Sequence, residues 1–319
     1  MFGAIDAQSP FDRLPTYGFR CVKILPGTAV PEATLAPIPL ISRDFAKERP
    51  VPDSVFAIYK NLYRYDARPL DAAPDPIEES NEFWTKQKVT FKAAYGNERM
   101  SAYLFLPKKG SPPYQTVVFF PSTDPFAQRS SRDLDFFGCD FVVKSGRALV
   151  YPIYKGTYER WDEPLSRPET AAYRDHVIEW SKDLGRTIDY IETRKDLDHE
   201  KLAYYGLSLG AYLGSILPAV EARVRVAVLL SGGFHWSMGS PEVDEINFAP
   251  RVRVPTLMVN GRYDSIFPLE TLQEPMFKLL GAPEKDKRHA VFDGGHVPPN
   301  DLVIKEILDW LDRYQGPVK

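Results

Sequence analysis

Lys201-Leu-Ala-Tyr-Tyr-Gly-Leu-Ser208-Leu-Gly-Ala-Tyr-Leu-Gly214 is the stretch of this chain that says most about its fold. The apolar run 202–205 has the length of a buried strand, and from residue 209 the apolar residues recur at helical spacing. Between them lies a Gly-x-Ser-x-Gly pattern, residues 206–210. On a tight strand-to-helix turn the serine hydroxyl projects above the sheet, and its neighbours must be glycine because strand and helix lie too close for a Cβ. The pattern predicts a nucleophile elbow with Ser208 at its tip; the alternative is a plain glycine-rich turn.

Strand and helix patterns alternate on both sides of this motif. An antiparallel hairpin is expected over 88–106, where apolar residues alternate with polar ones around a Gly96-Asn97 turn. Further strands are expected at 117–120, 148–153, 202–205, 224–230, 256–260 and 290–292, with helices around 134–143, 177–191, 269–280 and 304–311. Strands that are apolar throughout are typical of parallel sheets buried on both faces. We therefore predict an α/β fold with a mostly parallel, twisted sheet and helices on both faces.

Residues 1–85 differ from the rest of the chain because they are irregular and rich in proline. Proline disfavours long helices and central strands, and one short helix is expected from Asp53, as N-cap, to Leu62. Because this segment keeps many apolar side chains, we expect an N-terminal extension that wraps on the main domain. The main domain is then 86–319, with a short excursion at 232–252 that forms a modest cap.

Composition narrows the classes of partner. The net charge of −3 and the lack of basic runs argue against nucleic acid. Two cysteines are too few for a disulfide framework and fit a reducing, cytoplasmic location. The first residues lack the pattern of a signal peptide, and no apolar run reaches transmembrane length, so no membrane partner is expected. Metal-ligand spacings, Walker loops and dinucleotide-binding glycine patterns are missing, so neither a metal nor a cofactor is predicted.

A serine nucleophile needs a base, and the base needs a carboxylate that orients it. His296 follows the last predicted strand, at the sheet edge where sites form, and the two glycines before it are expected to supply unusual backbone angles. Asp264 follows the strand 256–260 and lies between the serine and the histidine in sequence. We predict Ser208, Asp264 and His296 as the catalytic residues.

Other residues remain open for these roles. His235 is the second choice of base, while His289, among basic residues, is interpreted as a surface residue. Asp244 and Glu245 are the second choices of acid. Asp264 could instead cap the following helix, and His296 could be an ordinary loop residue.

A tetrahedral intermediate needs two N–H donors for its oxyanion. Leu209 is expected to supply one, and the loop after the strand 117–120 the other, from Thr123 or, as second choice, Ser122. The predicted pocket residues are aromatic side chains and one histidine near the same edge: Tyr154, Phe234, His235, Trp236, Phe248 and Phe267. Structural packing is an equally good interpretation of Tyr154.

With these residues placed, the chain resembles the α/β-hydrolase superfamily from about Phe83 to Tyr314. The segments 202–210, 255–264 and 294–296 are similar to the dienelactone-hydrolase-like or acetyl-xylan-esterase-like domains that end large bacterial multidomain serine/threonine kinases. Residues 17–23 resemble the end of a formylglycine-generating-type domain, which implies a longer parent protein. The chain departs from these relatives in having Ser208 where dienelactone hydrolases use cysteine, and Pro121-Ser-Thr123 in place of a His-Gly pair.

The favoured hypothesis is a serine carboxylesterase that hydrolyses small or medium acyl esters through an acyl-enzyme, because the excursion 232–252 is too short for a deep lid. One alternative is a serine peptidase or amidase with the same triad, although the N-terminal segment is too short for a gating propeller. The other is a non-catalytic hydrolase-fold interaction module of a kinase-linked protein. The partner is expected to be a small-molecule ester, with a homodimer and covalently linked neighbour domains left open.

Overall fold

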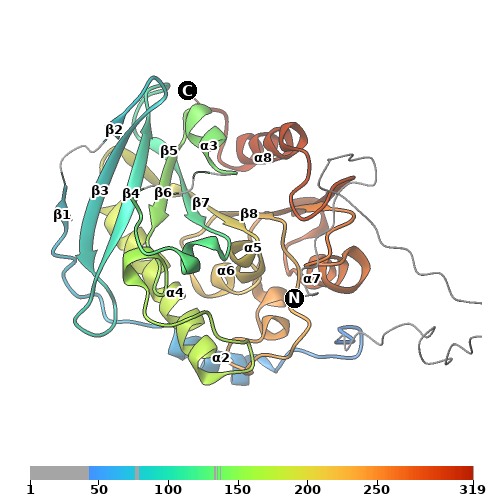
Figure 1. The fold of residues 1–319 in the computed structure, drawn as a ribbon. Coiled ribbons are helices and arrows are strands. Elements are labelled where there is room, and N and C mark those ends of the chain that lie inside the picture. Colours follow the sequence, from blue (N-terminus) through green and yellow to red (C-terminus); the bar gives the residue numbers. More distant parts are fainter. Residues whose placement is uncertain (1–42, 76–78, 133, 135, 137, 319) are drawn as a thin grey trace, which may run out of the picture.

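The computed structural model describes residues 43–318 apart from 76–78, 133, 135 and 137. The segment 17–23, with its resemblance to a formylglycine-generating-type domain, lies outside the described residues. In the described part, ten strands form one sheet in the order β1-β3-β4-β6-β5-β7-β8-β9-β10, with β2 also paired to β3 (Figure 1). The strands are β1 (Ala73–Pro74), β2 (Glu79–Ser80), β3 (Trp84–Lys92), β4 (Arg99–Pro107), β5 (Tyr114–Phe120), β6 (Ala148–Pro152), β7 (Leu197–Leu207), β8 (Val226–Leu230), β9 (Thr256–Gly261) and β10 (Lys287–Phe292).

The pairing confirms a hairpin that leads into a parallel sheet. β3 and β4 pair antiparallel from Trp84↔Pro107 to Lys92↔Arg99, and β4 pairs antiparallel with β6. From β6 through β5, β7, β8 and β9 to β10 every pairing is parallel. The carboxyl ends of these six strands therefore meet at one edge of the sheet, where the loops that follow them can converge.

Helices cover both faces, as the apolar strands predict. They are α2 (Asp53–Leu62), α3 (Asp140–Lys144), α4 (Ala171–Glu192), α5 (Leu209–Leu213), α6 (Leu217–Val220), α7 (Glu274–Leu279) and α8 (Asn300–Tyr314). Figure 1 shows α3 and α8 on one side of the sheet and α2, α4 and α6 on the other. Each side has its own apolar core. The predicted inner face of α4 is confirmed, because these side chains are fully buried: Val177, Trp180, Leu184, Ile188 and Ile191.

Two local predictions differ from the structure. The helix expected around 134–143 begins only at Asp140, because Gly138 has a φ of +72° that no α-helix accommodates. Asp53 is not an N-cap: Pro52 holds that position, and the Asp53 carboxylate accepts a hydrogen bond from Arg251 instead.

The described part of the N-terminal segment lies against the main domain through aromatic and charged contacts. Phe45 packs on Phe234 with ring centroids 4.8 Å apart, and Phe56 on Phe248 at 5.1 Å. Arg43 bonds to the Asp244 carboxylate at 2.9 Å. These contacts join residues 43–56 to the excursion 232–252.

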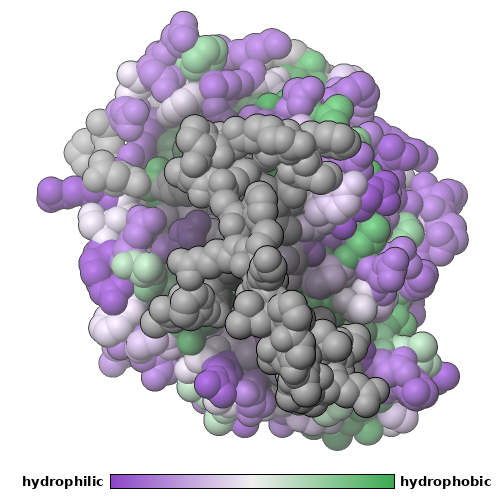
Figure 2. Space-filling model, turned by 45° about the vertical axis from the view of Figure 1, so that its right-hand side comes forward, coloured by the Kyte–Doolittle hydropathy of each residue, from purple (hydrophilic) through white to green (hydrophobic). Residues whose placement is uncertain are grey.

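The outer surface is mixed in character. On the face drawn in Figure 2, hydrophilic residues are spread over the described surface, with apolar residues in smaller groups between them. Among the described residues, no helix combines the length and apolarity that crossing a membrane requires.

Candidate active site

The turn between β7 and α5 has the strained geometry of a nucleophile elbow. Ser208 has φ +54° and ψ −105°, which costs a non-glycine residue about 1–3 kcal/mol. Its N–H donates to the Leu230 carbonyl at 2.9 Å, so the tip of the turn is fastened to the end of β8. A Cβ on Gly206 would lie 2.2 Å from the Gly210 carbonyl oxygen, and one on Gly210 would lie 2.2 Å from the Phe120 carbonyl oxygen. Only glycine fits at positions 206 and 210, two residues before and two residues after this serine.

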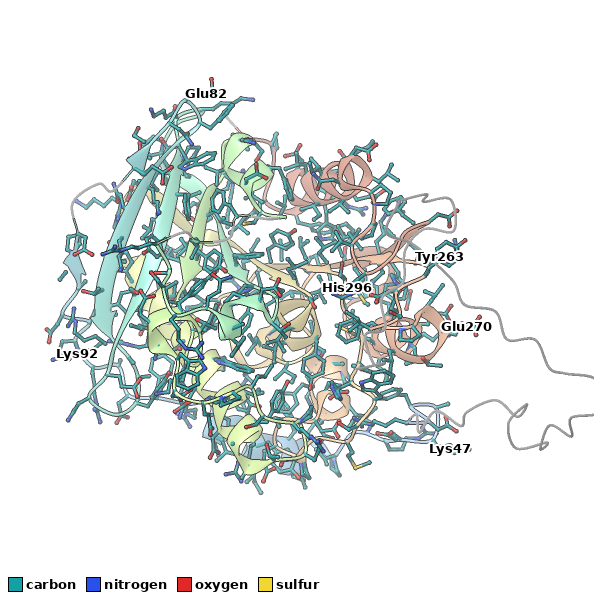
Figure 3. The ribbon with its side chains drawn as sticks, viewed as in Figure 1. Lys47, Glu82, Lys92, Tyr263, Glu270 and His296 are labelled. Carbon is teal, nitrogen blue, oxygen red and sulfur yellow. The ribbon has the colours of Figure 1, made fainter. Side chains whose placement is uncertain are left out.

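Three side chains predicted from separate parts of the sequence form one hydrogen-bonded chain. Ser208 Oγ lies 2.9 Å from His296 Nε2, and His296 Nδ1 lies 2.9 Å from Asp264 Oδ2. The Asp264 side chain is fully buried, whereas 21% of the His296 side chain is exposed. In the view of Figure 3, His296 lies nearer the centre of the molecule than Tyr263, which follows β9, and Glu270, which lies in the turn Leu269–Gln273.

The surroundings of Asp264 determine the tautomer of His296. Its Oδ1 accepts the N–H groups of Ile266 at 2.8 Å and Phe267 at 3.1 Å, which leaves Oδ2 for the ring. An ionised carboxylate only accepts hydrogen bonds, so Nδ1 must carry the ring proton and Nε2 must be the acceptor. The free lone pair of Nε2 therefore faces the Ser208 hydroxyl, as a general base requires.

Close backbone approach, rather than unusual backbone angles, brings the Asp264 and His296 loops together. The unusual backbone angles expected of Gly294 and Gly295 do not include a positive φ, since neither glycine has one. Instead a Cβ on Gly261 would lie 1.7 Å from the Gly295 carbonyl oxygen. The Tyr263 N–H donates to the Gly294 carbonyl at 2.9 Å. The end of β9 and the loop after β10 can thus run side by side only because a side chain is missing at the contact.

The loop after β5, predicted to supply an oxyanion donor, is held beside the elbow. The Gly210 N–H donates to the Pro121 carbonyl at 3.2 Å. The Ser122 hydroxyl lies 3.1 Å from Asp124 Oδ2 and accepts the Asp124 N–H, which closes a small local turn. Thr123 then begins the 3₁₀ turn Asp124–Ala127, and Leu209 begins α5. Thr123 therefore stands at the amino end of a 3₁₀ turn, and Leu209 directly follows Ser208 at the amino end of a helix.

Three of the predicted pocket residues are core residues. Tyr154, Phe234 and Phe248 have no exposed surface. The Tyr154 ring stacks on Phe120 at 4.0 Å, and its hydroxyl lies 3.4 Å from the Phe119 carbonyl. The other two pack on Phe45 and Phe56 of the N-terminal segment, as described above. Their apolar character serves packing, which spacing along the chain could not distinguish from a pocket.

The remaining predicted pocket residues retain contact with the site or with solvent. The Phe267 ring stacks on His296 at 6.0 Å between centroids. Trp236 is 37% exposed and His235 is partly buried. The His235 ring binds the Ser237 N–H through Nδ1 at 3.1 Å, and burial lowers its pKa. Its hydrogen bonds therefore do not make it the base of Ser208.

The second-choice acids belong to a buried ion cluster instead. Glu245, fully buried, accepts the His235 N–H at 2.8 Å and the Tyr212 hydroxyl of α5 at 3.2 Å, and it pairs with Arg43 at 3.3 Å. Burial and the neighbouring Asp244 carboxylate raise the pKa of Glu245 to about 8. The cluster connects the N-terminal segment, the excursion and α5, a role that no local sequence pattern signals.

His289 is also placed differently from its predicted surface position. Its Nε2 lies 3.1 Å from Asn260 Oδ1, and its ring lies 5.4 Å from that of Phe277. Burial lowers the pKa of His289 to about 4. Among the residues that the structure describes, no group of three or more histidine, cysteine or acidic side chains is arranged to hold a metal ion.

Comparison with known proteins supports the fold at low sequence identity. No protein-family model and no curated protein sequence matches the chain. The structure of acetyl xylan esterase 1 from Thermoanaerobacterium sp. superposes with a TM-score of 0.65 at 16% identity, covering 84% of this chain and 96% of that one. The acetyl xylan esterase from Paenibacillus sp. R4 gives 0.60 at 17% identity, covering 82% and 94%.

A protein assigned as a dienelactone hydrolase from Klebsiella pneumoniae subsp. pneumoniae gives a TM-score of 0.54 at 18% identity, covering 72% of this chain and 99% of that one. Strand order, helix placement and these likenesses agree. The chain has the α/β-hydrolase fold and resembles acetyl xylan esterases and dienelactone hydrolases in structure.

Proposed function

We propose that the chain is a serine carboxylesterase. The observation that carries this proposal is the unbroken chain Ser208 Oγ–His296 Nε2 and His296 Nδ1–Asp264 Oδ2, both links 2.9 Å long, at the carboxyl edge of the sheet. A serine on a strained turn, a base with the correct tautomer and a buried acid are together what acyl transfer requires.

In the proposed reaction Ser208 Oγ bonds to the ester carbonyl carbon while its proton moves to His296 Nε2. The imidazolium is stabilised by Asp264 and then gives that proton to the departing alcohol oxygen as the C–O bond breaks. Water, deprotonated by the same nitrogen, attacks the acyl-serine, and the proton returns to Ser208 Oγ as the carboxylic acid leaves. Atoms and charge balance without any further reactant.

The developing oxyanion would be bound by backbone N–H groups, for which we propose Leu209 and Thr123, with Ser122 as the alternative to Thr123. Support comes from the Gly210–Pro121 hydrogen bond, which keeps the two loops adjacent. Each such donor contributes about 3–4 kcal/mol to the transition state in serine hydrolases.

Small or medium acyl esters fit this site better than long-chain lipids. The excursion 232–252 is anchored by buried Phe234 and Phe248 and by Glu245, so most of its apolar surface is spent on packing. Trp236, which is exposed, and Phe267, which stacks on the base, are the aromatic residues we propose for substrate contact.

The test is a panel of nitrophenyl esters of increasing acyl length, with fluorophosphonate labelling of the same samples. Ser208→Ala should lose label and at least about a thousand-fold in kcat, in line with triad deletions elsewhere. Ser215→Ala is the matched control, since this buried serine lies two residues after α5 and its hydroxyl donates to the Tyr212 carbonyl at 2.7 Å. Retained turnover in Ser208→Ala would overturn the proposal, as would faster cleavage of aminoacyl anilides than of esters. An unlabelled native chain would favour a non-catalytic module.

A further inference from the structure

A buried glutamine lies behind the turn that carries Asp264. Gln273 ends the π-helical turn Leu269–Gln273 before α7 and is fully buried. Its Nε2 donates to the Gly261 carbonyl at 3.1 Å and to the Phe267 carbonyl at 2.6 Å. These two carbonyls stand three residues before and three residues after Asp264, so one amide spans the whole turn.

The glutamine amide has only one orientation that fits. Both partners are carbonyl oxygens, which only accept, so the NH₂ group must face them. Gln273 Oε1 is then buried with no partner among the described residues. An unmet buried acceptor destabilises the folded state by about 1–3 kcal/mol, which an apolar side chain of the same length would avoid. That cost offsets part of what the two donated hydrogen bonds contribute to stability, and the specific contribution of the glutamine is this pair of donors.

Those donors hold the geometry on which the acid depends. The N–H groups that bind Asp264 Oδ1 belong to Ile266 and Phe267, within the turn that Gln273 spans. The Phe267 ring also stacks on His296. Movement of the turn would therefore displace the carboxylate and the ring face beside the base together, and misplacement by 1 Å can reduce a rate about a hundred-fold.

We infer that Gln273 is a positioning residue for the Asp264–His296 pair, acting through the turn 261–267 and not by contact with substrate. The inference rests on the proposed function for its kinetic consequences. Its geometric consequence, a displaced Asp264–His296 hydrogen bond, can be measured without any substrate.

The chain offers a matched control in Gln315. This glutamine is 2% exposed, and its Nε2 also joins two carbonyls, of Thr116 at 3.1 Å and Lys201 at 2.6 Å, away from the carboxyl edge of the sheet. Gln273→Met and Gln315→Met each remove two such bonds from a buried position, and Gln315→Met also removes the bond that Arg147 Nε donates to Gln315 Oε1 at 3.2 Å. Both variants should be less stable than the native chain, and only Gln273→Met should change the kinetics, the pH profile and the NMR signal of His296.

In kinetics, Gln273→Met should lower kcat about ten- to a hundred-fold, with KM changed less than about two-fold, because positioning acts on the transition state. The acid limb of the kcat/KM profile should also move to lower pH, since a carboxylate held less well favours the protonated imidazole less. A variant with a smaller folded fraction has lower apparent kcat/KM at every pH, but the pH at which its acid limb falls is unchanged. Gln315→Met should keep the native limb.

Gln273→Glu provides a second variant of the same shape. Its carboxyl donates only while protonated and repels the two carbonyls once ionised. Its activity relative to the native chain should therefore fall as pH rises, a trend that Gln273→Met does not share.

The substrate-free measurement is the low-field proton NMR signal of His296 Nδ1–H in the folded variants. We expect it shifted or broadened in Gln273→Met and native in Gln315→Met. A native signal and a native acid limb in folded Gln273→Met would overturn the inference even if the chain is an active esterase. An altered signal in a chain that fluorophosphonate never labels would support the positioning role and refute the proposed function.

Discussion

Replacing Asp264 by asparagine tests whether the buried acid works by fixing the tautomer of His296. The carboxylate has one oxygen on two backbone N–H groups, of Ile266 and Phe267, and the other on His296 Nδ1. The amide of asparagine has only one oxygen, which can face either the two backbone N–H groups or His296 Nδ1. Turning NH₂ toward the two N–H groups would lose both hydrogen bonds, at about 1 kcal/mol each, and would leave three donors facing one another.

The amide oxygen should therefore stay on the backbone and NH₂ should face the ring. Nδ1 then has to accept, Nε2 carries the proton, and Ser208 loses its base. The same tautomer error lowers kcat about 10⁴-fold in a serine protease, equivalent to about 5.5 kcal/mol. We expect a loss of that order in Asp264→Asn, with KM changed little, because ground-state contacts are untouched.

The assay is steady-state hydrolysis of the best nitrophenyl ester across the neutral pH range, with denaturant unfolding to show that the variant folds. Asp293→Asn is the control, since this nearby carboxylate is 60% exposed and pairs with Arg262 on the surface. A folded Asp264→Asn variant that keeps a tenth or more of native kcat would refute the tautomer argument.

The other predictions concern stability and loop contact. Burial lowers the pKa of His289 to about 4, so between about pH 6.5 and 4 the unfolded chain binds a proton that the folded chain does not. The free energy of unfolding is therefore highest above pH 6.5 and decreases as the pH falls toward 4. Between pH 7 and 4.5 the native chain should lose about 2 kcal/mol of stability through this residue, and His289→Gln should not show that part of the loss in urea unfolding. An unchanged pH dependence in the variant would contradict this. Gly261→Ala should lower the free energy of unfolding by about 2–3 kcal/mol or more and remove most of kcat, because its Cβ would clash with the Gly295 carbonyl oxygen. The control is Gly239→Ala, whose Cβ would have its nearest contact 3.5 Å away and which should leave the thermal melt and turnover unchanged. Arg43→Met removes the guanidinium that pairs with the buried Asp244 and Glu245 side chains and should destabilise the fold by about 3 kcal/mol at neutral pH in urea unfolding; native stability would show that the cluster does not hold the N-terminal segment.

Much of the fold follows from local sequence patterns. Apolar strand runs, their alternation with helices and the hairpin over 88–106 depend on neighbouring residues, so period and turn chemistry reveal them. The elbow is equally local, since the two close contacts of Gly206 and Gly210 are made within a few residues or to the adjacent strand. Order along the chain then suggested Asp264 and His296, because parallel strands bring their carboxyl ends to one edge.

The predictions that failed depended on contacts between distant segments. Tyr154 and Phe248 have the same composition signal as pocket aromatics, and only packing against Phe120 and Phe56 makes them core. The basic neighbours of His289 predict a surface position, but successive residues of a strand face opposite sides of the sheet, and the His289 ring lies beside Asn260. Gln273 had one faint signal, a polar residue on the apolar helical face of Leu272 and Met276, that did not say what it would bind.

By itself the sequence determined which residues could do chemistry: a serine with no room for side chains around it, and an acid and a histidine after later strands. The tertiary structure decided the distances of 2.9 Å, the proton position on His296 and the burial of Asp264. The physical reason is the distance along the chain over which each kind of interaction acts. Propensity and spacing act over a few residues, whereas a hydrogen bond between residues 88 apart exists only once the sheet has closed and packed.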